Sequence, residues 1–322
     1  MPTLPALVID RVEPLPALPT ADTDRAAAFA RQDKAPATRK AYRSDFAGFQ
    51  VWCTTRGVDA LPAIAETVAA YLASEAEAGR KPSTINRRCA AIRYAHKLAG
   101  HEPPTNSDVV KATLRGIRRT IGAAPARKAP VLAETARAMA FVVPNGLKGL
   151  RDRALLLLGF SGAFRRSELV ALDVGDLEET EDGYRVTIRR SKTDQEGHGA
   201  TVAIVRGGTC CPLKAVKGWL AAAGITEGPI FRPIAKGGKV GDRRLAAKSV
   251  CDITKAYAGR VGLDGAAYGA HSLRSGFLTS AARRGASVFK MRDVSRHKSM
   301  DVLQAYVRDA DLFRDHAGAG LL

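Results

Sequence analysis

The sequence predicts a mainly α-helical protein with a small antiparallel β-sheet, built as a helical first domain and an α+β second domain. Three observations lead to this prediction. Apolar residues recur at helical spacing through residues 25–122, apolar and polar residues alternate in 184–189 and 201–204, and a small-residue, proline-containing linker separates the halves at 123–130. At 322 residues the chain is long enough for two domains with separate cores.

The first domain, residues 25–122, is expected to contain four helices. Thr38 is a candidate N-cap for the first, which ends before Gly57. The second covers about residues 65–79, the third about 83–100, and the fourth starts near Ser107.

The second domain, residues 131–322, mixes element types, whereas residues 1–24 read as a flexible proline-rich arm. The alternating segments predict a β-hairpin that contains Lys192 in its turn. Helices are expected at about 150–159, 211–223, 246–261, 272–284 and in the stretch through Tyr306. No internal repeat is present.

The net charge of +18 and the pI near 10.0 are unusually high for a globular protein. Residues 1–124 carry 18 basic and 12 acidic residues, a balance of +6, and residues 125–322 carry 32 and 20, a balance of +12. Such a field attracts polyanions, and nucleic acid is the commonest partner of so basic a chain. Two basic halves favour a protein that grips double-stranded DNA from two sides. The alternative is a charged surface that only keeps the protein in solution.

Two successive helices carry basic residues beside an apolar stripe, and acidic residues hardly interrupt either stripe. The linker adds two positive charges. We interpret this surface as one that contacts DNA phosphates, although the solvated face of an ordinary helix has the same pattern. The candidate DNA-binding residues are Arg87, Arg88, Arg93, Lys97, Lys111, Arg115, Arg118, Arg119, Arg127 and Lys128.

The five cysteines are odd in number and include no C-x-x-C pair, so neither a disulfide framework nor a zinc site is predicted. The N-terminus lacks the pattern of a signal peptide, and no apolar stretch is long enough to span a bilayer. We therefore expect a cytoplasmic, nucleoid-associated protein without a membrane partner. P-loop and H-E-x-x-H motifs are also absent, and no metal or other cofactor is expected.

Six residues stand out because together they suit the cleavage of a phosphodiester by transesterification. Arginine remains charged and matches a phosphate with two parallel hydrogen bonds, histidine serves as acid or base, and a tyrosine hydroxyl becomes a nucleophile when positive charge and a base activate it. The six candidates, in chain order, are Arg165, Lys192, His271, Arg274, His297 and Tyr306.

The motifs around these residues resemble those of the tyrosine recombinases, or phage integrase family. G-A-F-R-R-S-E-L at 162–169 is similar to the family's first arginine box, and H-S-L-R at 271–274 to its H-x-L-R box. R-H-K-S at 296–299, followed by Tyr306, resembles the last histidine and the nucleophilic tyrosine, and Lys192 matches the catalytic lysine. The resemblance covers about residues 30–315 and implies a SAM-like core-binding domain and a catalytic domain that form a clamp around DNA.

The resemblance also implies a role for each residue. Tyr306 would attack the scissile phosphate and form a 3′-phosphotyrosyl bond, without metal or ATP. Arg165 and Arg274 would bind the nonbridging oxygens, with a further hydrogen bond from His297. His271 would accept the tyrosine proton and Lys192 would protonate the leaving 5′-oxygen, while Glu168 would orient Arg165. The implied protein is a site-specific recombinase or mobile-element integrase that acts as a homotetramer on two synapsed sites, or with a related recombinase.

One position departs from the family pattern. The family usually has glycine directly before the last histidine, where this chain has Arg296. Its side chain either adds charge near the phosphate or points to solvent. The segment after Tyr306 is also short, and in relatives a C-terminal segment docks on the neighbouring protomer.

Each motif has an ordinary structural explanation when it is taken alone. Arg165 with Glu168 is also a common i,i+3 helix pair, His271 and Arg274 can cap a helix, and a tyrosine on an amphipathic helix usually belongs to the core. Two other functions share the same features. A type IB topoisomerase uses the same nucleophile but relaxes supercoiled DNA as a monomer, and a non-catalytic DNA-binding protein on an integrase fold forms no covalent complex.

Overall fold

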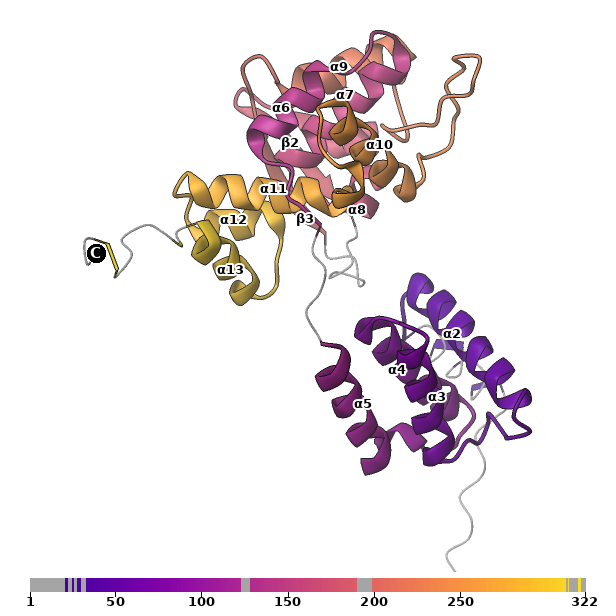
Figure 1. The fold of residues 1–322 in the computed structure, drawn as a ribbon. Coiled ribbons are helices and arrows are strands. Elements are labelled where there is room, and N and C mark those ends of the chain that lie inside the picture. Colours follow the sequence, from indigo (N-terminus) through magenta and orange to yellow (C-terminus); the bar gives the residue numbers. More distant parts are fainter. Residues whose placement is uncertain are drawn as a thin grey trace, which may run out of the picture. The chain divides into compact units, whose positions relative to one another are not determined.

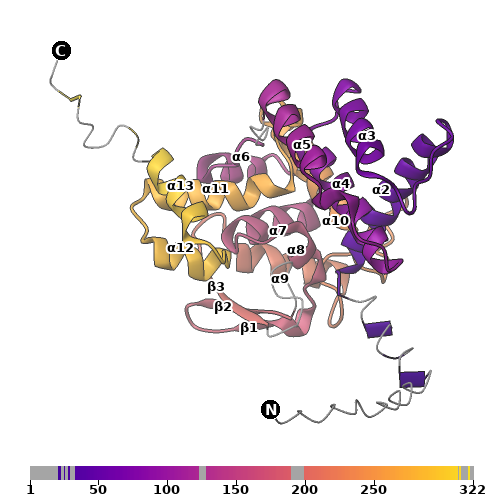
Figure 2. The same ribbon diagram turned by 90° about the horizontal axis from the view of Figure 1, so that it is seen from below.

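The computed structural model describes residues 33–122, 128–189 and 199–310, with a few isolated positions outside these ranges. The chain divides into two compact units, Met1–Pro125 and Ala126–Leu322, called unit 1 and unit 2 below. Figure 1 and Figure 2 label the elements of both units in two views. Within the described ranges, no helix combines the length and the apolar character needed to cross a membrane.

From residue 33 onward, unit 1 consists of the four predicted helices and one turn of 3₁₀-helix. The helices are α2 (Pro36–Thr54), α3 (Ala65–Glu77), α4 (Pro82–Leu98) and α5 (Asp108–Ile121), and the 3₁₀ turn η1 is Pro104–Asn106. Their apolar faces meet in one core.

The predicted starts of two helices in unit 1 had different outcomes. Ser107 caps α5, since its hydroxyl accepts a hydrogen bond from the N–H of Val110 at 3.4 Å. Thr38 was wrong as the N-cap of α2, because the helix already begins at Pro36. Proline is favoured in the first turn, where its missing N–H costs no hydrogen bond and its fixed φ suits the helix.

Unit 2 contains eight α-helices among its described residues, together with the 3₁₀ turns η2 (Val174–Asp176) and η3 (Gly265–Ala267). The predicted helices are present, each within about three residues of its expected bounds. Three short helices were not predicted: α6, α8 and α12. The α-helices are α6 (Ala133–Phe141), α7 (Leu147–Ser161), α8 (Arg166–Ala171), α9 (Pro212–Ala223), α10 (Ala247–Arg260), α11 (Ala270–Arg283), α12 (Val288–Ser295) and α13 (Met300–Ala310).

The sheet of unit 2 has three antiparallel strands in the order β1 (Leu177–Glu179), β2 (Gly183–Ile188) and β3 (Ala200–Val205), seen side by side in Figure 2. The predicted pairing of β2 with β3 is confirmed, and Val186 lies opposite Val202. Buried and exposed side chains alternate along β2, as expected of a strand with one face on a core. β1 was missed because three residues are too few to show an alternation.

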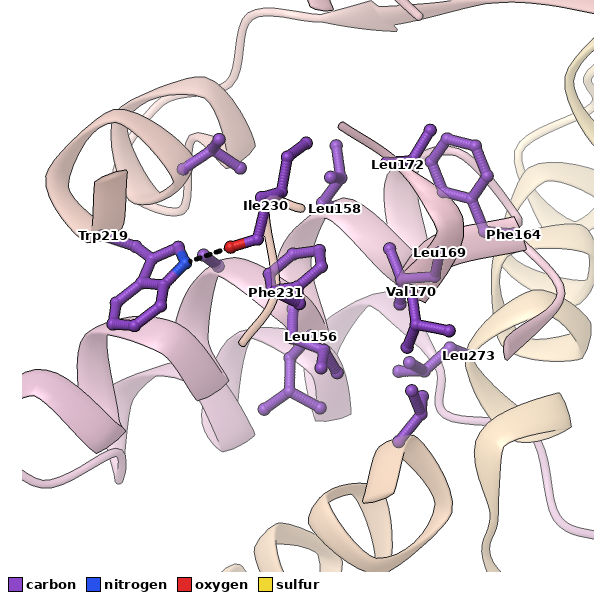
Figure 3. Close-up of a cluster of buried hydrophobic side chains, with 14 of the residues drawn as sticks. Leu156, Leu158, Phe164, Leu169, Val170, Leu172, Trp219, Ile230, Phe231 and Leu273 are labelled. Atoms are coloured by element: carbon purple, nitrogen blue, oxygen red, sulfur yellow. Dashed lines mark hydrogen bonds between the residues drawn. The ribbon is translucent and has the colours of Figure 1, made fainter. Parts of the chain in front are cut away.

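The core of unit 2 holds together the helices that carry the candidate site. Figure 3 shows Trp219, whose indole Nε1 donates to the Ile230 carbonyl at 2.7 Å, and the side chains of Leu169 on α8 and Leu273 on α11. A Cβ at Gly159 of α7 would lie 2.9 Å from Leu169 and 3.1 Å from Leu273. Glycine there lets the three helices approach closely, which fixes the amino-terminal end of α8 relative to α11.

Candidate active site

Arg165 directly precedes α8, where Glu168 holds both its backbone and its side chain. The Arg165 N–H donates to Glu168 Oε2 at 2.9 Å, and Arg165 Nη1 donates to Oε1 at 2.6 Å. A glutamate at the third helical position often satisfies the free N–H at the helix start in this way. The Glu168 side chain is 1% exposed and that of Arg165 is 17% exposed. The carboxylate is therefore buried, while the guanidinium it orients reaches the surface.

Arg274 is almost completely buried in α11 and links two segments of the site. Its Nη1 donates to the Ala163 carbonyl at 2.7 Å, and its Nη2 lies 3.3 Å from each ring nitrogen of His297. Burial and the charges of Arg165 and Arg296 lower the pKa of Arg274 to about 9. A guanidinium nevertheless stays charged near neutral pH. The lowered pKa therefore marks crowded positive charge, where an anion is stabilised.

His297 follows α12 and is held from both sides. Its Nδ1 lies 2.8 Å from the hydroxyl of Ser295, which is fully buried. Burial, followed by the charges of Arg274 and Arg165, lowers the pKa of His297 to about 4. The imidazole is therefore neutral at pH 7, and a Ser295 hydroxyl that donates to Nδ1 places the ring proton on Nε2.

His271 lies one turn before Arg274 on α11. Much of its surface reaches solvent, yet partial desolvation of the ring and the charges of Arg274 and Arg165 lower its pKa below the usual value. A neutral imidazole is the form that can accept a proton.

Tyr306 lies on α13 and is partly buried. It packs against a small apolar cluster that joins α11, α12 and α13 and includes Leu278, Met291 and Leu303. Its phenolic group is close enough to Arg274 to raise the pKa of that guanidinium. Tyr306 therefore belongs to an apolar cluster, as the structural alternative predicted, and also lies close to the arginines of the candidate site.

Arg296 has a place that the sequence did not reveal. The interpretation that it points to solvent is wrong: the side chain is 11% exposed, and Nη2 donates to Glu168 Oε2 at 2.8 Å. The guanidinium also lies 5.2 Å from the ring centroid of Phe164. These partners stand about 130 residues earlier in the chain, so no local pattern could have indicated the contact.

Two of the predicted residues, Lys192 and Arg127, lie outside the described residues. Lys192 stands in the sequence between β2, which ends at Ile188, and β3, which begins at Ala200. At the end of β2, Arg189 donates to Asp176 at 2.8 Å.

The other candidate DNA-binding residues lie mostly on the surface of unit 1. Arg88 is the most enclosed, because it donates to Tyr71 Oη at 2.9 Å and pairs with Glu75. In unit 2, Lys128 donates to the Ala266 carbonyl at 2.5 Å. Seven residues of unit 1 are exposed: Arg87, Arg93, Lys97, Lys111, Arg115, Arg118 and Arg119.

Three of the exposed arginines also make contacts within unit 1. Arg93 donates from Nε to the Thr105 hydroxyl at 3.1 Å. Arg87 forms a two-pronged pair with Asp45 at 2.7 and 3.1 Å. Arg118 donates to Asn86 at 2.9 Å.

The site thus combines three guanidiniums, two neutral imidazoles and a tyrosine within one unit. Within the described ranges, no group of three or more His, Cys, Asp or Glu side chains gathers in a way that suits a metal ion. The positive charge of these side chains comes from arginine, which suits the binding of an oxyanion close to a nucleophile.

Comparison with known proteins shows the family to which this chain belongs. A sequence model of the phage integrase family matches residues 132–312, which include all six candidate residues. This chain belongs to the phage integrase family. It is 40% identical over 292 residues to an integrase/recombinase XerD homolog of Selenomonas ruminantium, covering 89% of this chain and 85% of that protein. It is also 24% identical over 280 residues to the Cre recombinase of Escherichia phage P1, covering 81% and 80%.

The fold of this integrase-family chain agrees with that of solved recombinases. It resembles the XerH site-specific recombinase bound to palindromic difH substrate with a TM-score of 0.63 at 15% identity, over 95% of this chain and 85% of that one. It also resembles a lambda integrase dimer bound to a core site, with a TM-score of 0.59 at 16% identity, over 90% and 95%. The predicted fold class is confirmed.

Proposed function

We propose that this protein is a site-specific recombinase that cleaves and rejoins double-stranded DNA through a 3′-phosphotyrosyl intermediate at Tyr306, without metal or ATP. The proposal rests on one observation: Arg165 and His297 lie close to Arg274, which binds the Ala163 carbonyl, and Tyr306 lies near the same guanidinium. In this role the two guanidiniums bind the nonbridging oxygens of the scissile phosphate. Neutral His297 donates a hydrogen bond to the same oxygens from Nε2.

The proposed reaction conserves the number of phosphodiester bonds. The Tyr306 oxygen bonds to phosphorus, the bond to the 5′-oxygen breaks, and the tyrosine proton passes to His271. Lys192 gives a proton to the leaving 5′-oxygen. Attack by a 5′-hydroxyl on the phosphotyrosine reverses these steps and rejoins a strand. Because the ester bond energy is retained in the enzyme-linked intermediate, the cycle consumes no nucleotide.

Positive charge that is held in place before DNA arrives is the main source of rate acceleration in this proposal. Preorganised donors around a developing negative charge commonly account for the largest share of a rate enhancement. Arg274 is held by a backbone carbonyl and Arg165 by a buried carboxylate. Both side chains are therefore already in place before the phosphate binds.

We further propose that the exposed basic residues of α4 and α5 contact DNA phosphates. The solved XerH recombinase is bound to palindromic difH substrate, and the lambda integrase dimer is bound to a core site. The slope of log K for DNA binding against log salt concentration measures how many phosphates the protein neutralises. Replacing Arg115 or Arg119 with alanine should make this slope less steep by about 0.9 for each phosphate contact that is lost. An unchanged slope in both variants would place the DNA elsewhere. The active assembly proposed is a homotetramer on two synapsed sites, or a complex with a related recombinase.

Covalent capture tests the proposed chemistry directly. Wild-type and Tyr306→Phe protein are incubated with a pool of nicked duplexes whose arms are randomised, in the presence of a chelator, and SDS-resistant adducts are isolated and sequenced. We expect adducts from the wild type alone, enriched for one sequence. The phenylalanine variant should still bind the enriched duplex, since only a hydroxyl is lost.

Each alternative predicts a different result. Adducts from Tyr306→Phe would exclude this residue as the nucleophile. Relaxation of a supercoiled plasmid that lacks the enriched sequence would favour a type IB topoisomerase. Sequence-specific binding by both proteins with no adduct from either would favour a non-catalytic DNA-binding protein.

A further inference from the structure

Arg296 has a left-handed backbone, with φ of 58° and ψ of 41°, directly before His297. Side chains other than Gly and Asn are uncommon in this region, and there the conformation costs about 1–3 kcal/mol. The residue ends α12, and its backbone N–H donates to the Arg292 carbonyl at 2.7 Å. The turn sends the Arg296 side chain inward, toward the residues around Arg165.

The guanidinium of Arg296 contacts the first arginine box at several points. Nη2 donates to Glu168 Oε2 at 2.8 Å, Nη1 lies 3.3 Å from the Gly162 carbonyl, and Nη2 lies 3.5 Å from the Ala163 carbonyl. The aromatic ring of Phe164 covers one side of the group. The side chain thus ties the segment that ends at His297 to the segment that carries Arg165.

Arg296 also changes the charge balance of the site. Glu168 accepts from Arg165 on both of its oxygens and from Arg296 on Oε2. Arg274 feels the charge of the same carboxylate without bonding it, so the three guanidiniums and Glu168 together carry an excess of two positive charges. Without Arg296 the excess would be one. The pentacoordinate transition state of phosphodiester transesterification carries about two negative charges, so the larger excess matches it better.

We propose that Arg296 is a positioning residue that shares Glu168 with Arg165 and holds His297 against the segment that carries Arg165. Arg165 and His297 would then contact the scissile phosphate in their reactive geometry. This inference rests on the proposed recombinase function. Arg296 contacts Glu168, Phe164 and backbone carbonyls, so the proposed role is to hold these groups and requires no contact with the phosphate.

The protonation of Glu168 is consistent with this role. Burial is the largest single effect and would raise the pKa of Glu168, but the charge of Arg296 and the hydrogen bonds and charge of Arg165 together outweigh it and lower the pKa. Arg296 thus helps to keep the carboxylate ionised, and an ionised carboxylate is what orients Arg165.

The test compares Arg296→Gly with wild type on the enriched nicked duplex. Glycine accepts the left-handed backbone without strain, so the variant keeps the turn and loses only the side chain. We expect the single-turnover rate of adduct formation to fall about 10- to 100-fold, since small misplacement of reacting groups has effects of this size. DNA affinity should change by less than about twofold, because phosphate contacts along the DNA dominate binding.

Three comparisons separate positioning from charge and from folding. Arg292→Ala removes an exposed arginine from the same helix and should leave the rate unchanged. Guanidinium ion at millimolar concentration should restore part of the rate of Arg296→Gly by occupying the space beside Glu168 and Phe164, whereas sodium at the same ionic strength should not. Arg296→Lys should be intermediate, because an ammonium lacks the planar fork of guanidinium.

A measurement without DNA tests the geometry independently. Arg296 is one of the charges that lower the pKa of His297, so an NMR titration should find this pKa higher in Arg296→Gly than in wild type. A wild-type rate in the glycine variant, or a joint loss of rate and affinity without rescue, would overturn the inference. An unchanged His297 pKa would overturn it as well. Failure of the proposed function is distinct: the wild type itself would then form no adduct.

Discussion

Replacing Glu168 by glutamine should destabilise unit 2 strongly, even though the change removes only one charge. Glu168 accepts three hydrogen bonds: from the backbone N–H and the Nη1 of Arg165, and from the Nη2 of Arg296. A glutamine has one acceptor oxygen. If that oxygen replaces Oε2, the amide NH₂ faces a guanidinium that can only donate.

The magnitude follows from these contacts. One charge-assisted bond is lost, worth about 1.5–3 kcal/mol, and the other two lose the negative charge of their acceptor, which costs about 1 kcal/mol each. Arg165 can turn toward solvent, whereas Arg296 is held inside without a counter-ion. We therefore expect Glu168→Gln to lower the free energy of unfolding of unit 2 by about 3–5 kcal/mol, as is typical when one partner of a buried ion pair is removed.

The two tryptophans allow the units to be followed separately. Trp52 lies in unit 1 and Trp219 in unit 2, so in a Trp52→Phe background the fluorescence change during urea unfolding reports on unit 2 alone. Glu178→Gln is the matched control. Glu178 pairs with Arg185 on the surface, where such a pair contributes at most about 1 kcal/mol.

The pH dependence checks the cause. The pKa of Glu168 is lowered in the folded protein, so its contribution is fully present above the pKa of an unfolded glutamate, about 4.3, and is lost as the pH falls through the folded value. The stability difference between wild type and Glu168→Gln should therefore be constant near neutral pH and shrink only below about pH 4.3. A difference below about 1 kcal/mol at pH 7 would refute the account of Glu168 as the anchor of two arginines.

Three further predictions concern other parts of unit 2. Gly276→Ala should destabilise it by about 1–3 kcal/mol, because a Cβ would lie 1.7 Å from the Val131 carbonyl oxygen, while Gly218→Ala, with nothing within 4 Å, should stabilise it slightly in the same fluorescence assay. The folded pKa of His297, about 4, lies below the unfolded value, so the free energy of unfolding should fall as the pH drops from about 6.5 toward 4. His297→Gln should make this pH dependence weaker. An equally steep dependence in the variant would contradict the assignment. Arg274→Ala should slow adduct formation about 10²- to 10³-fold with a smaller loss of affinity; equal losses would indicate a simple phosphate anchor.

Most elements with a local motif or period were predicted from the sequence, although Thr38 was wrong as the cap of α2. Ser107 predicted the start of α5, and the alternation through Val186 and Val202 predicted the paired strands, because caps and strand patterns act over a few residues. The helices that the sequence missed are short. α8 has six residues, and its formation depends on packing of Leu169 against the core rather than on an apolar period.

The candidate site shows the same contrast between local motifs and contacts that depend on the fold. The motifs selected Arg165, Arg274 and His297 as candidates, and the structure brings these three side chains together. Arg296 was beyond reach, because its partners lie in a distant segment and a basic residue near a helix end usually faces solvent. Only the fold shows that a residue outside the family pattern has joined the hydrogen bonds of the first arginine box.

Two residues other than glycine have left-handed backbones among the described residues, and both belong to the site. They are Ala163, with φ of 45°, and Arg296, with φ of 58°. Each costs about 1–3 kcal/mol, and such strain persists only where surrounding contacts enforce it. Here the Ala163 carbonyl accepts from Arg274, and Glu168 binds Arg296, so the strained turns are held by the same guanidiniums that crowd positive charge together.

Neither the strain nor the crowding of charge benefits the free protein, since both reduce its stability. The crowding of charge becomes favourable when an oxyanion enters between Arg165 and Arg274, because the anion offsets the repulsion from Arg165 and Arg296 that, after burial, lowers the pKa of Arg274. The site is thus organised for a charge that its substrate brings. An anion that mimics the phosphate should accordingly raise the stability of unit 2, and Arg165 and Arg274 should be the residues on which that gain depends most.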